Sequence, residues 1–283
     1  MVSTKLHVFK FGDDIWDPSH RFETSWLLPP WVLFAVRAAI SFYAFFVLLF
    51  VIFWEIARYQ NGTAMARFEF SYFTILCYWG IAFYFLTAAI HTFSYALHGG
   101  TPLLNRLPRP LQALHALFHT TITTFPLLVT IVYWGVIFRG VYPTGWFPQV
   151  FTAWSNISEH ALNTCFALFE IFFARTNPAP WIHLLWLIAI LACYLGLAYI
   201  TVATKHQYVY SFLNPAVAKN GMVAAYVFGI AVAICIIFAV VRGLVVARKW
   251  VTEEKMGRQG KFYGGRGMGT GEIELETMRM WEK

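Results

Sequence analysis

The sequence predicts an all-α integral membrane protein that crosses the bilayer about six times. Hydrophobic residues make up 59% of the chain and charged residues only 12%, whereas about a quarter of the residues of soluble domains are charged. The aromatic residues Phe, Trp and Tyr, which are included in the hydrophobic fraction, alone make up 19% of the chain. A soluble protein of this length still presents a large polar exterior to water, so the apolar excess indicates a chain surrounded by lipid.

Six stretches are long and apolar enough to cross the bilayer as helices, which takes ~20 residues each. Pro and Gly separate these stretches, for example at Pro29-Pro30 and Gly99-Gly100, where helices readily end. Trp residues lie near their ends, as interfacial anchors do. Together the six stretches form one predicted transmembrane domain over residues 31–247. The predicted spans are residues 31–54, 68–93, 111–138, 150–173, 181–203 and 221–247.

The distribution of basic residues predicts the orientation of the chain. An even number of spans places both termini on one side, which holds fourteen Lys and Arg outside the spans against five on the other side. The positive-inside rule therefore places the N-terminal segment 1–30 and the C-terminal tail 248–283 in the cytoplasm. The tail is basic and Gly-rich, and is predicted to be disordered. The sequon at Asn61 then lies on the lumenal or external side, in the endoplasmic reticulum, another endomembrane or the plasma membrane.

The net charge of +7 does not indicate nucleic acid. Eight Lys and Arg lie between Arg248 and Lys283 without an accompanying aromatic surface, a pattern typical of a segment attracted to anionic lipid. The expected partners are therefore membrane lipids and no nucleic acid. The four Cys lie within apolar stretches and form no CxxC pair, so we expect small buried thiols and no disulfide framework.

A polar stripe runs along the fourth stretch. Asn156, His160, Asn163, Ala167 and Glu170 recur at steps of four, three, four and three, which places them on one helical face. Ionisable groups within a bilayer are costly and face the bundle interior or a wet cavity. The Asn residues alone would be explained by hydrogen bonds between helices, whereas the added His and Glu also fit a functional site.

The second stretch carries a smaller polar face formed by Ser71, Thr74 and Tyr78. A Thr in a membrane helix usually bonds its own helix backbone. Here, however, Thr74 follows the start of its stretch by six residues and His160 follows Trp154 by six, or ~9 Å along each helix. The predicted topology places both in the lumenal leaflet at similar depth, where a hydroxyl and an imidazole can act as nucleophile and base.

Five short motifs follow one another between residues 68 and 215. In these motifs and their order, the chain resembles the androgen-induced protein family of small membrane proteins. The fungal members of that family share its length and layout. The motifs are Tyr72-Phe73-Thr74, Val141-Tyr142-Pro143, Ser158-Glu159-His160, Phe166-Ala167-Leu168-Phe169-Glu170 and Lys205-His206-Gln207-Tyr208-Val209-Tyr210-Ser211-Phe212-Leu213.

The resemblance implies a lipid hydrolase. The characterised animal members are threonine hydrolases that cleave esters of hydroxy fatty acids with fatty acids. At the matching positions, the family's proposed nucleophile is Thr74 and its essential His is His160. This chain departs from the animal pattern at Ser211, where the animal motif has Pro, and in the residues that flank Thr74 and His160.

The expected chemistry is acyl transfer. His160 would accept the proton of the Thr74 hydroxyl and return it to the leaving alcohol. Asn156 and Asn163 lie within one turn of His160 and could orient its ring or bind an oxyanion. Glu170 lies ~15 Å further along the helix, so we assign it a cavity-lining or structural role.

Three more residues join the predicted supporting set. His206 and Tyr208 follow the fifth stretch and are expected to cap the pocket mouth, and Tyr78 shares the face of Thr74. We expect a lipid-ester substrate, no cofactor and no metal.

A haem or metal protein is a first alternative. Several histidines lie near the cytoplasmic ends of the second, third and fifth stretches, and one pair has the i,i+4 spacing that suits shared metal ligation. Facing histidines also suit axial haem ligation, whereas the HxxHH box of membrane di-iron enzymes is absent from the sequence. These histidines are His91, His98, His115, His119 and His183.

A transporter, channel or scaffold is a second alternative. Transporters often contain repeats and broken helices, but the sequence shows no repeat, and its only proline in the middle of a span is Pro126. Arg37 and Arg242 would pair with Glu170 or extend toward the interface.

Overall fold

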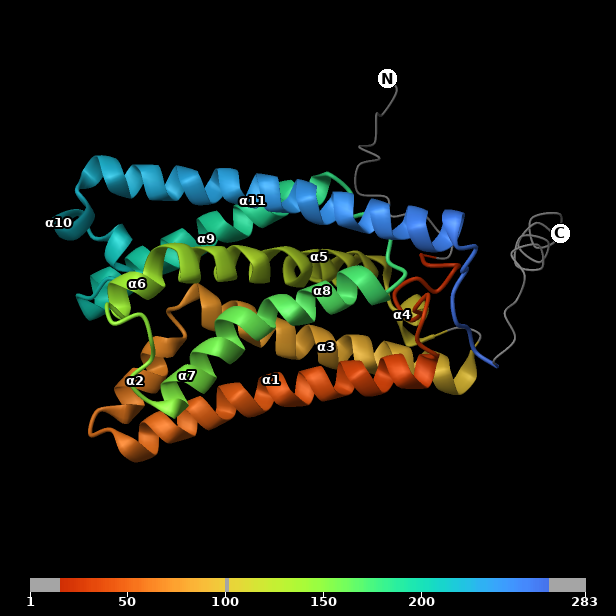
Figure 1. Cartoon of the computed structure of the whole chain (residues 1–283), viewed down its shortest axis with the longest axis horizontal. Helices are drawn as coiled ribbons and strands as arrows, with labels where there is room; N and C mark the ends of the chain where they lie inside the picture. Colours follow the sequence, from red (N-terminus) through yellow and green to blue (C-terminus); the bar gives the residue numbers. More distant parts are fainter. Residues whose placement is uncertain (1–15, 100–101, 265–283) are drawn as a thin grey trace, which may run out of the picture.

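The computed structural model describes residues 16–99 and 102–264, and these form an all-α bundle of roughly parallel and antiparallel helices (Figure 1). The long helices are α1 (Pro30–Arg58), α3 (Phe73–His98), α5 (Arg109–Val132), α9 (Ile182–Lys205) and α11 (Asn220–Lys249). The shorter helices are α2 (Gly62–Glu69), α4 (Leu103–Arg106), α6 (Phe138–Val141), α7 (Val150–Ile157), α8 (Asn163–Phe173) and α10 (Pro215–Ala218).

The chain is a polytopic membrane protein. Five helical runs in the described part of the chain are long and apolar enough to span a membrane, and each contains most of one predicted span. Two of them contain π-helical segments, since α5 continues through the turn Tyr133–Ile137 into α6, and α11 continues into Trp250–Lys255. The five runs are Pro30–Arg58, Phe73–His98, Arg109–Val141, Ile182–Lys205 and Gly221–Lys255.

The remaining predicted span, the fourth along the chain, is the interior helix of the bundle. Residues 150–173 form α7, a π-helical turn at Ser158–Leu162, and α8 without interruption, so its predicted limits are confirmed. Its polar stripe leaves it less apolar than the five candidate spans. Of its side chains only Val150, Cys165 and Phe172 are exposed, because α3, α5 and α11 contact it. Neighbouring helices therefore shield these polar groups from lipid.

Helix ends follow from local chemistry. Pro30 occupies the first turn of α1, where its missing N–H leaves no bond unmade. α3 ends at Gly99, which has φ 67° and donates its N–H to the Tyr95 carbonyl, a common helix termination. In the body of the bundle, α1 and α3 pack closely through Ala44, Ala82 and Ala88, as small residues allow in membrane helices.

The described chain begins and ends at the same end of the bundle. Residues 16–29 fold back over it, and the Ser25 hydroxyl donates to the Phe173 carbonyl at 2.6 Å. Ser25 also forms isolated bridges to Ala174 and Lys261. The first part of the C-terminal tail differs from the predicted disorder, because residues 250–255 continue the helix of α11. Residues 265–283 lie outside the described residues. The side of the membrane that this end faces stays a prediction.

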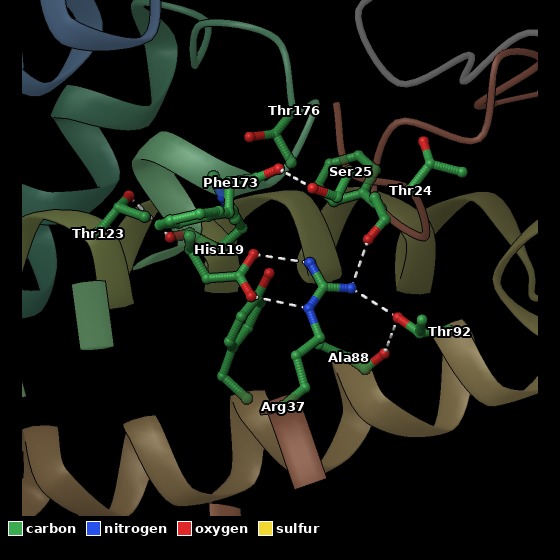
Figure 2. A network of polar contacts seen from close by, with 12 residues as sticks. Thr24, Ser25, Arg37, Ala88, Thr92, His119, Thr123, Phe173 and Thr176 are labelled. Atoms are coloured by element: carbon green, nitrogen blue, oxygen red, sulfur yellow. Dashed lines mark hydrogen bonds and ion pairs between the residues drawn. The ribbon is translucent and has the colours of Figure 1, made fainter. Parts of the chain in front are cut away.

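One buried ion pair joins the helices at this end (Figure 2). Arg37 on α1 donates from Nε and Nη2 to the two carboxylate oxygens of Glu170 on α8, at 2.8 and 2.7 Å, and both side chains are fully buried. Its Nη1 donates to the Thr92 hydroxyl on α3 at 2.6 Å and to the Phe22 carbonyl at 2.7 Å. Of the two arrangements predicted for Arg37, the structure shows the ion pair with Glu170 and not extension toward the interface. Glu170 therefore has a structural role.

We expect removal of one partner of this pair to destabilise the protein by about 3–5 kcal/mol, since it leaves an uncompensated buried charge. Glu170→Leu and Arg37→Met should each lower the thermal midpoint of the detergent-purified protein. The double variant should lose less than either single variant, because no buried charge is left. Equal or additive losses in the three variants, measured by size-exclusion thermostability, would count against a coupled pair.

Candidate active site

Thr74 lies at the start of α3, beside two phenol groups from elsewhere in the chain. The Phe73 N–H donates to the hydroxyls of Tyr194, on α9, and Tyr210, both at 3.1 Å. Tyr194 donates in turn to the Ser71 carbonyl at 2.8 Å, and the Thr74 hydroxyl is close enough to Tyr210 to influence the pKa of its phenol. Burial raises the pKa of Tyr210 to about 12, so its phenol stays neutral at physiological pH. The α3 N-terminus therefore presents several hydroxyl groups in one place.

An apolar cavity of about 200 Å³ adjoins these hydroxyls. It lies between α3, α5, α9 and α11, and the turn Ser211–Leu213 closes part of it. The polar side chains that line it are Thr74, Tyr133, Tyr194 and Tyr210; the remaining lining residues are aliphatic or Phe. Such a cavity suits a hydrocarbon chain with one polar group near Thr74.

A second apolar cavity, of about 350 Å³, shares a wall with the first. Phe73 and Tyr194 line both cavities, and their rings are in contact with centroids 4.9 Å apart. The second cavity continues along α3 past Cys77 and Gly80. Thr74 thus neighbours the wall at which two apolar cavities meet.

His160 lies in the π-helical turn between α7 and α8. Its Nδ1 lies 3.0 Å from the Asn156 carbonyl oxygen, which can only accept, so Nδ1 carries the proton and Nε2 of the neutral ring is free to accept one. The ring stacks on Tyr133 with centroids 3.6 Å apart. The Tyr133 hydroxyl donates to the Asn156 amide oxygen at 2.6 Å. Backbone and ring contacts therefore fix both the tautomer and the orientation of His160.

Tyr133 connects His160 with the first cavity. It begins the π-helical turn Tyr133–Ile137 after α5, and it lines the same cavity as Thr74. π-Helical turns inside α-helices occur frequently at functional sites, and here two of them face each other. Among the described residues no hydrogen bond joins Thr74 to His160, and their pairing as nucleophile and base stays a prediction.

The two stripe asparagines bond within and between helices. The Asn156 amide nitrogen donates to the Thr152 carbonyl at 2.9 Å. The Asn163 amide oxygen accepts from Thr130 on α5 at 3.0 Å and from the Thr164 N–H at 2.6 Å. Neither Asn lines either cavity. Asn163 therefore acts as a hydrogen-bonding residue between helices, whereas Asn156 orients the His160 ring through its backbone carbonyl.

The other predicted supporting residues lie outside both cavities. His206 is exposed and ends α9 in a left-handed conformation, with φ 54°. Tyr208 is half-buried against the apolar cluster around Val209 and Phe212. Tyr78 is fully buried in the α1–α3 core, and its hydroxyl has no hydrogen-bond partner in the described structure. The segment after α9 instead contributes Tyr210 to the first cavity.

Sequence reasoning missed Tyr133, Tyr194 and Tyr210 as site residues. Tyr210 lies within the last of the five motifs, and Tyr194 is a polar side chain in the middle of an apolar span, which is a usable signal because such groups usually bond within the bundle. Tyr133 carries no comparable signal, since its ring reaches His160 only because the two π-helical turns face each other in the fold.

The histidines at the other end of the bundle form contacts with one another and with the helices. The rings of His91 and His115 meet edge to face with centroids 5.0 Å apart, which leaves no room for a haem between them. His183 hydrogen bonds to the Thr120 hydroxyl at 2.7 Å. No group of three or more His, Cys, Asp or Glu within residues 16–99 and 102–264 could hold a metal ion.

Comparison with protein-family models, with curated proteins and with solved structures finds no match to this chain.

The paired phenols at the α3 N-terminus predict a non-additive pair of mutations. Tyr194→Phe or Tyr210→Phe leaves the half-buried Phe73 N–H one acceptor, whereas the double variant leaves it none and should cost about 1–3 kcal/mol more than the sum of the single variants. A double-mutant cycle of thermal stability measures this coupling. Purely additive effects would show that the two hydroxyls do not share the N–H.

Proposed function

We propose that this chain is an integral membrane hydrolase that cleaves long-chain esters of fatty acids with hydroxy fatty acids, with Thr74 as nucleophile and His160 as base. The observation that carries the proposal is the position of Thr74 beside the Phe73–Tyr194 wall between two apolar cavities. An ester of this class has a hydrocarbon chain on each side of its carbonyl group. One chain in each cavity places the carbonyl carbon near the Thr74 hydroxyl.

The first half-reaction transfers the acyl group to the enzyme. The Thr74 oxygen attacks the ester carbonyl carbon while its proton moves to Nε2 of His160, and the tetrahedral intermediate carries the negative charge on the former carbonyl oxygen. The C–O bond to the alcohol then breaks, and His160 returns the proton to the leaving alkoxide. This yields a free hydroxy fatty acid and an ester on Thr74.

The second half-reaction releases the acid. A water molecule attacks the acyl-threonine as its proton moves to His160, and His160 then protonates the Thr74 oxygen as that bond breaks. The positive end of the α3 dipole favours negative charge near Thr74. The neutral Tyr210 phenol, which lines the first cavity together with Thr74, is the side-chain donor that we assign to the oxyanion.

The proposal requires His160 to reach Thr74 when substrate is bound. Catalytic hydrogen bonds are often long in a free enzyme and shorten in the complex. The fixed tautomer of His160 supports its role, because the nitrogen not bonded to Asn156 is the one that would take the proton. Its contact with Tyr133, a lining residue of the first cavity, supports access to that space.

The experiment is hydrolysis of long-chain branched fatty-acid esters by the purified protein, followed by mass spectrometry of the released acids. Thr74→Ala should abolish turnover and Thr74→Ser should retain part of it, whereas His160→Ala should lose roughly 10²–10⁴-fold. Thr87→Ala and His98→Ala are matched controls, because both side chains bond only the backbone of α3. Activity that persists in Thr74→Ala would exclude the threonine mechanism, and saturable ester binding without turnover in the wild type would indicate a lipid carrier.

Filling the second cavity should change the range of substrates. Gly80 lines it, and a Cβ at this position meets only Phe118, at 3.8 Å, so Gly80→Leu adds volume without a backbone clash. We expect kcat/KM for esters with two long chains to fall roughly 10–200-fold, and that for esters with one short chain to change little. Gly229→Leu, on an exposed face of α11, is the control. An equal fall for both ester classes would mean that the second cavity does not hold a chain.

A further inference from the structure

Three arginines from separate segments meet at the end of the bundle remote from Thr74. Arg21 belongs to the folded-back segment 16–29, Arg175 follows α8, and Arg248 lies near the end of α11. The Arg21 Nη1 donates to the Arg175 carbonyl at 3.0 Å, and the Arg248 Nη2 donates to the Thr176 carbonyl at 2.5 Å. Both arginines therefore hold the backbone of residues 175 and 176 in place.

Several hydrogen-bond donors of this cluster have no acceptor. Arg175 and Arg248 are only 4% and 5% exposed, and Thr176 is 1% exposed. Yet Arg175 Nε, Arg248 Nε and Nη1, and the Thr176 hydroxyl have no hydrogen-bond partner among the described residues. Buried guanidinium groups are costly unless they are paired and bonded. The unpaired donors of Arg175, Thr176 and Arg248 indicate that a bound group accepts several hydrogen bonds at this place.

The neighbouring carboxyl groups do not pair with Arg175 or Arg248. Glu253 pairs with Arg21 through two bonds, at 2.8 and 2.9 Å, and Glu170 pairs with Arg37. The Asp17 carboxylate accepts from the Phe22 N–H at 3.0 Å, and burial raises its pKa. Burial and then the charge of Arg21 lower the pKa of Arg175 to about 10. The Glu23 carboxyl, next to Thr24, is fully buried with neither oxygen hydrogen-bonded among the described residues, and burial raises its pKa well above the usual value. Neither Arg175 nor Arg248 forms an ion pair with a carboxylate in the described structure.

Exposed Trp residues indicate that the cluster lies at the level of the membrane interface. Trp31, Trp181 and Trp250 begin or follow helices at this end and are exposed, as Trp residues in contact with lipid headgroups are. Chain segment 257–264 covers one side, where Gly260 packs directly against the Arg175 side chain and Phe262 stacks on its guanidinium at 4.8 Å. Exposed basic residues of this segment, such as Arg258, add to the positive field.

We propose that Arg175, Thr176 and Arg248 form an anion site that binds the phosphate group of a phosphomonoester. Guanidinium N–H groups match phosphate oxygens in geometry and charge, and the Thr176 hydroxyl supplies a further donor. The same phosphate chemistry occurs in the headgroup of an anionic lipid and in a soluble phosphate. The site is independent of the proposed hydrolysis at Thr74.

The test is the thermal midpoint of the full-length protein in a neutral detergent at constant ionic strength. Inorganic phosphate, dioctanoyl phosphatidic acid and the zwitterionic dioctanoyl phosphatidylcholine are titrated separately. We expect a saturable rise with phosphatidic acid, with inorganic phosphate, or with both, and none with phosphatidylcholine. A rise with phosphatidic acid alone identifies a lipid headgroup as the source, and a rise with inorganic phosphate identifies a binding site for phosphate itself.

Three variants distinguish this site from general surface charge. Thr176→Val removes a hydroxyl that has no partner, so the basal midpoint should stay or rise while the apparent phosphate affinity falls roughly tenfold. Arg248→Gln should lower that affinity at least as much. Arg258→Gln removes an exposed charge at the same end and should leave it unchanged. No saturable rise in the wild type, or one that Thr176→Val and Arg248→Gln retain in full, would overturn the proposal.

Discussion

The ion pair between Arg37 and Glu170 is the constraint on which the bundle depends. A fully buried guanidinium needs a carboxylate and acceptors for its remaining N–H groups, and these come from α8, from α3 and from the segment before α1. The pair therefore fixes how far α8 inserts between its neighbours. Because His160 precedes Glu170 on the same continuous helix, the pair also sets the position of His160 relative to α3 and α5.

Most of the fold was predictable from apolar run length. The limits of the interior helix, residues 150–173, were predicted correctly, since its polar stripe still leaves enough apolar surface to form a span. The ion pair was one of two predicted alternatives for Arg37. The folding of residues 16–29 onto the bundle was not predicted, because Ser25 and Arg21 bond to distant carbonyls and to Glu253 without any apolar periodicity.

The candidate site was predictable only in part, because its geometry depends on contacts between distant residues. The polar stripe and the motifs singled out His160 and Thr74, but the π-helical turns that bring Tyr133 onto His160 have no sequence signature. The two phenols that cap α3 come from residues more than a hundred positions away. His206 and Tyr208 were placed near the pocket, whereas two residues later in the chain Tyr210 lines it. Proximity in sequence thus identified the segment but not the side chain.

The most direct test of Thr74 as the nucleophile is to locate the residue that a fluorophosphonate probe modifies. The labelled protein is digested and the adduct is assigned by peptide mass spectrometry. We expect the adduct on Thr74, and we expect labelling to be lost in His160→Ala when that variant elutes as a folded species. An adduct on a different residue, or undiminished labelling of Thr74 without His160, would contradict the proposed pair.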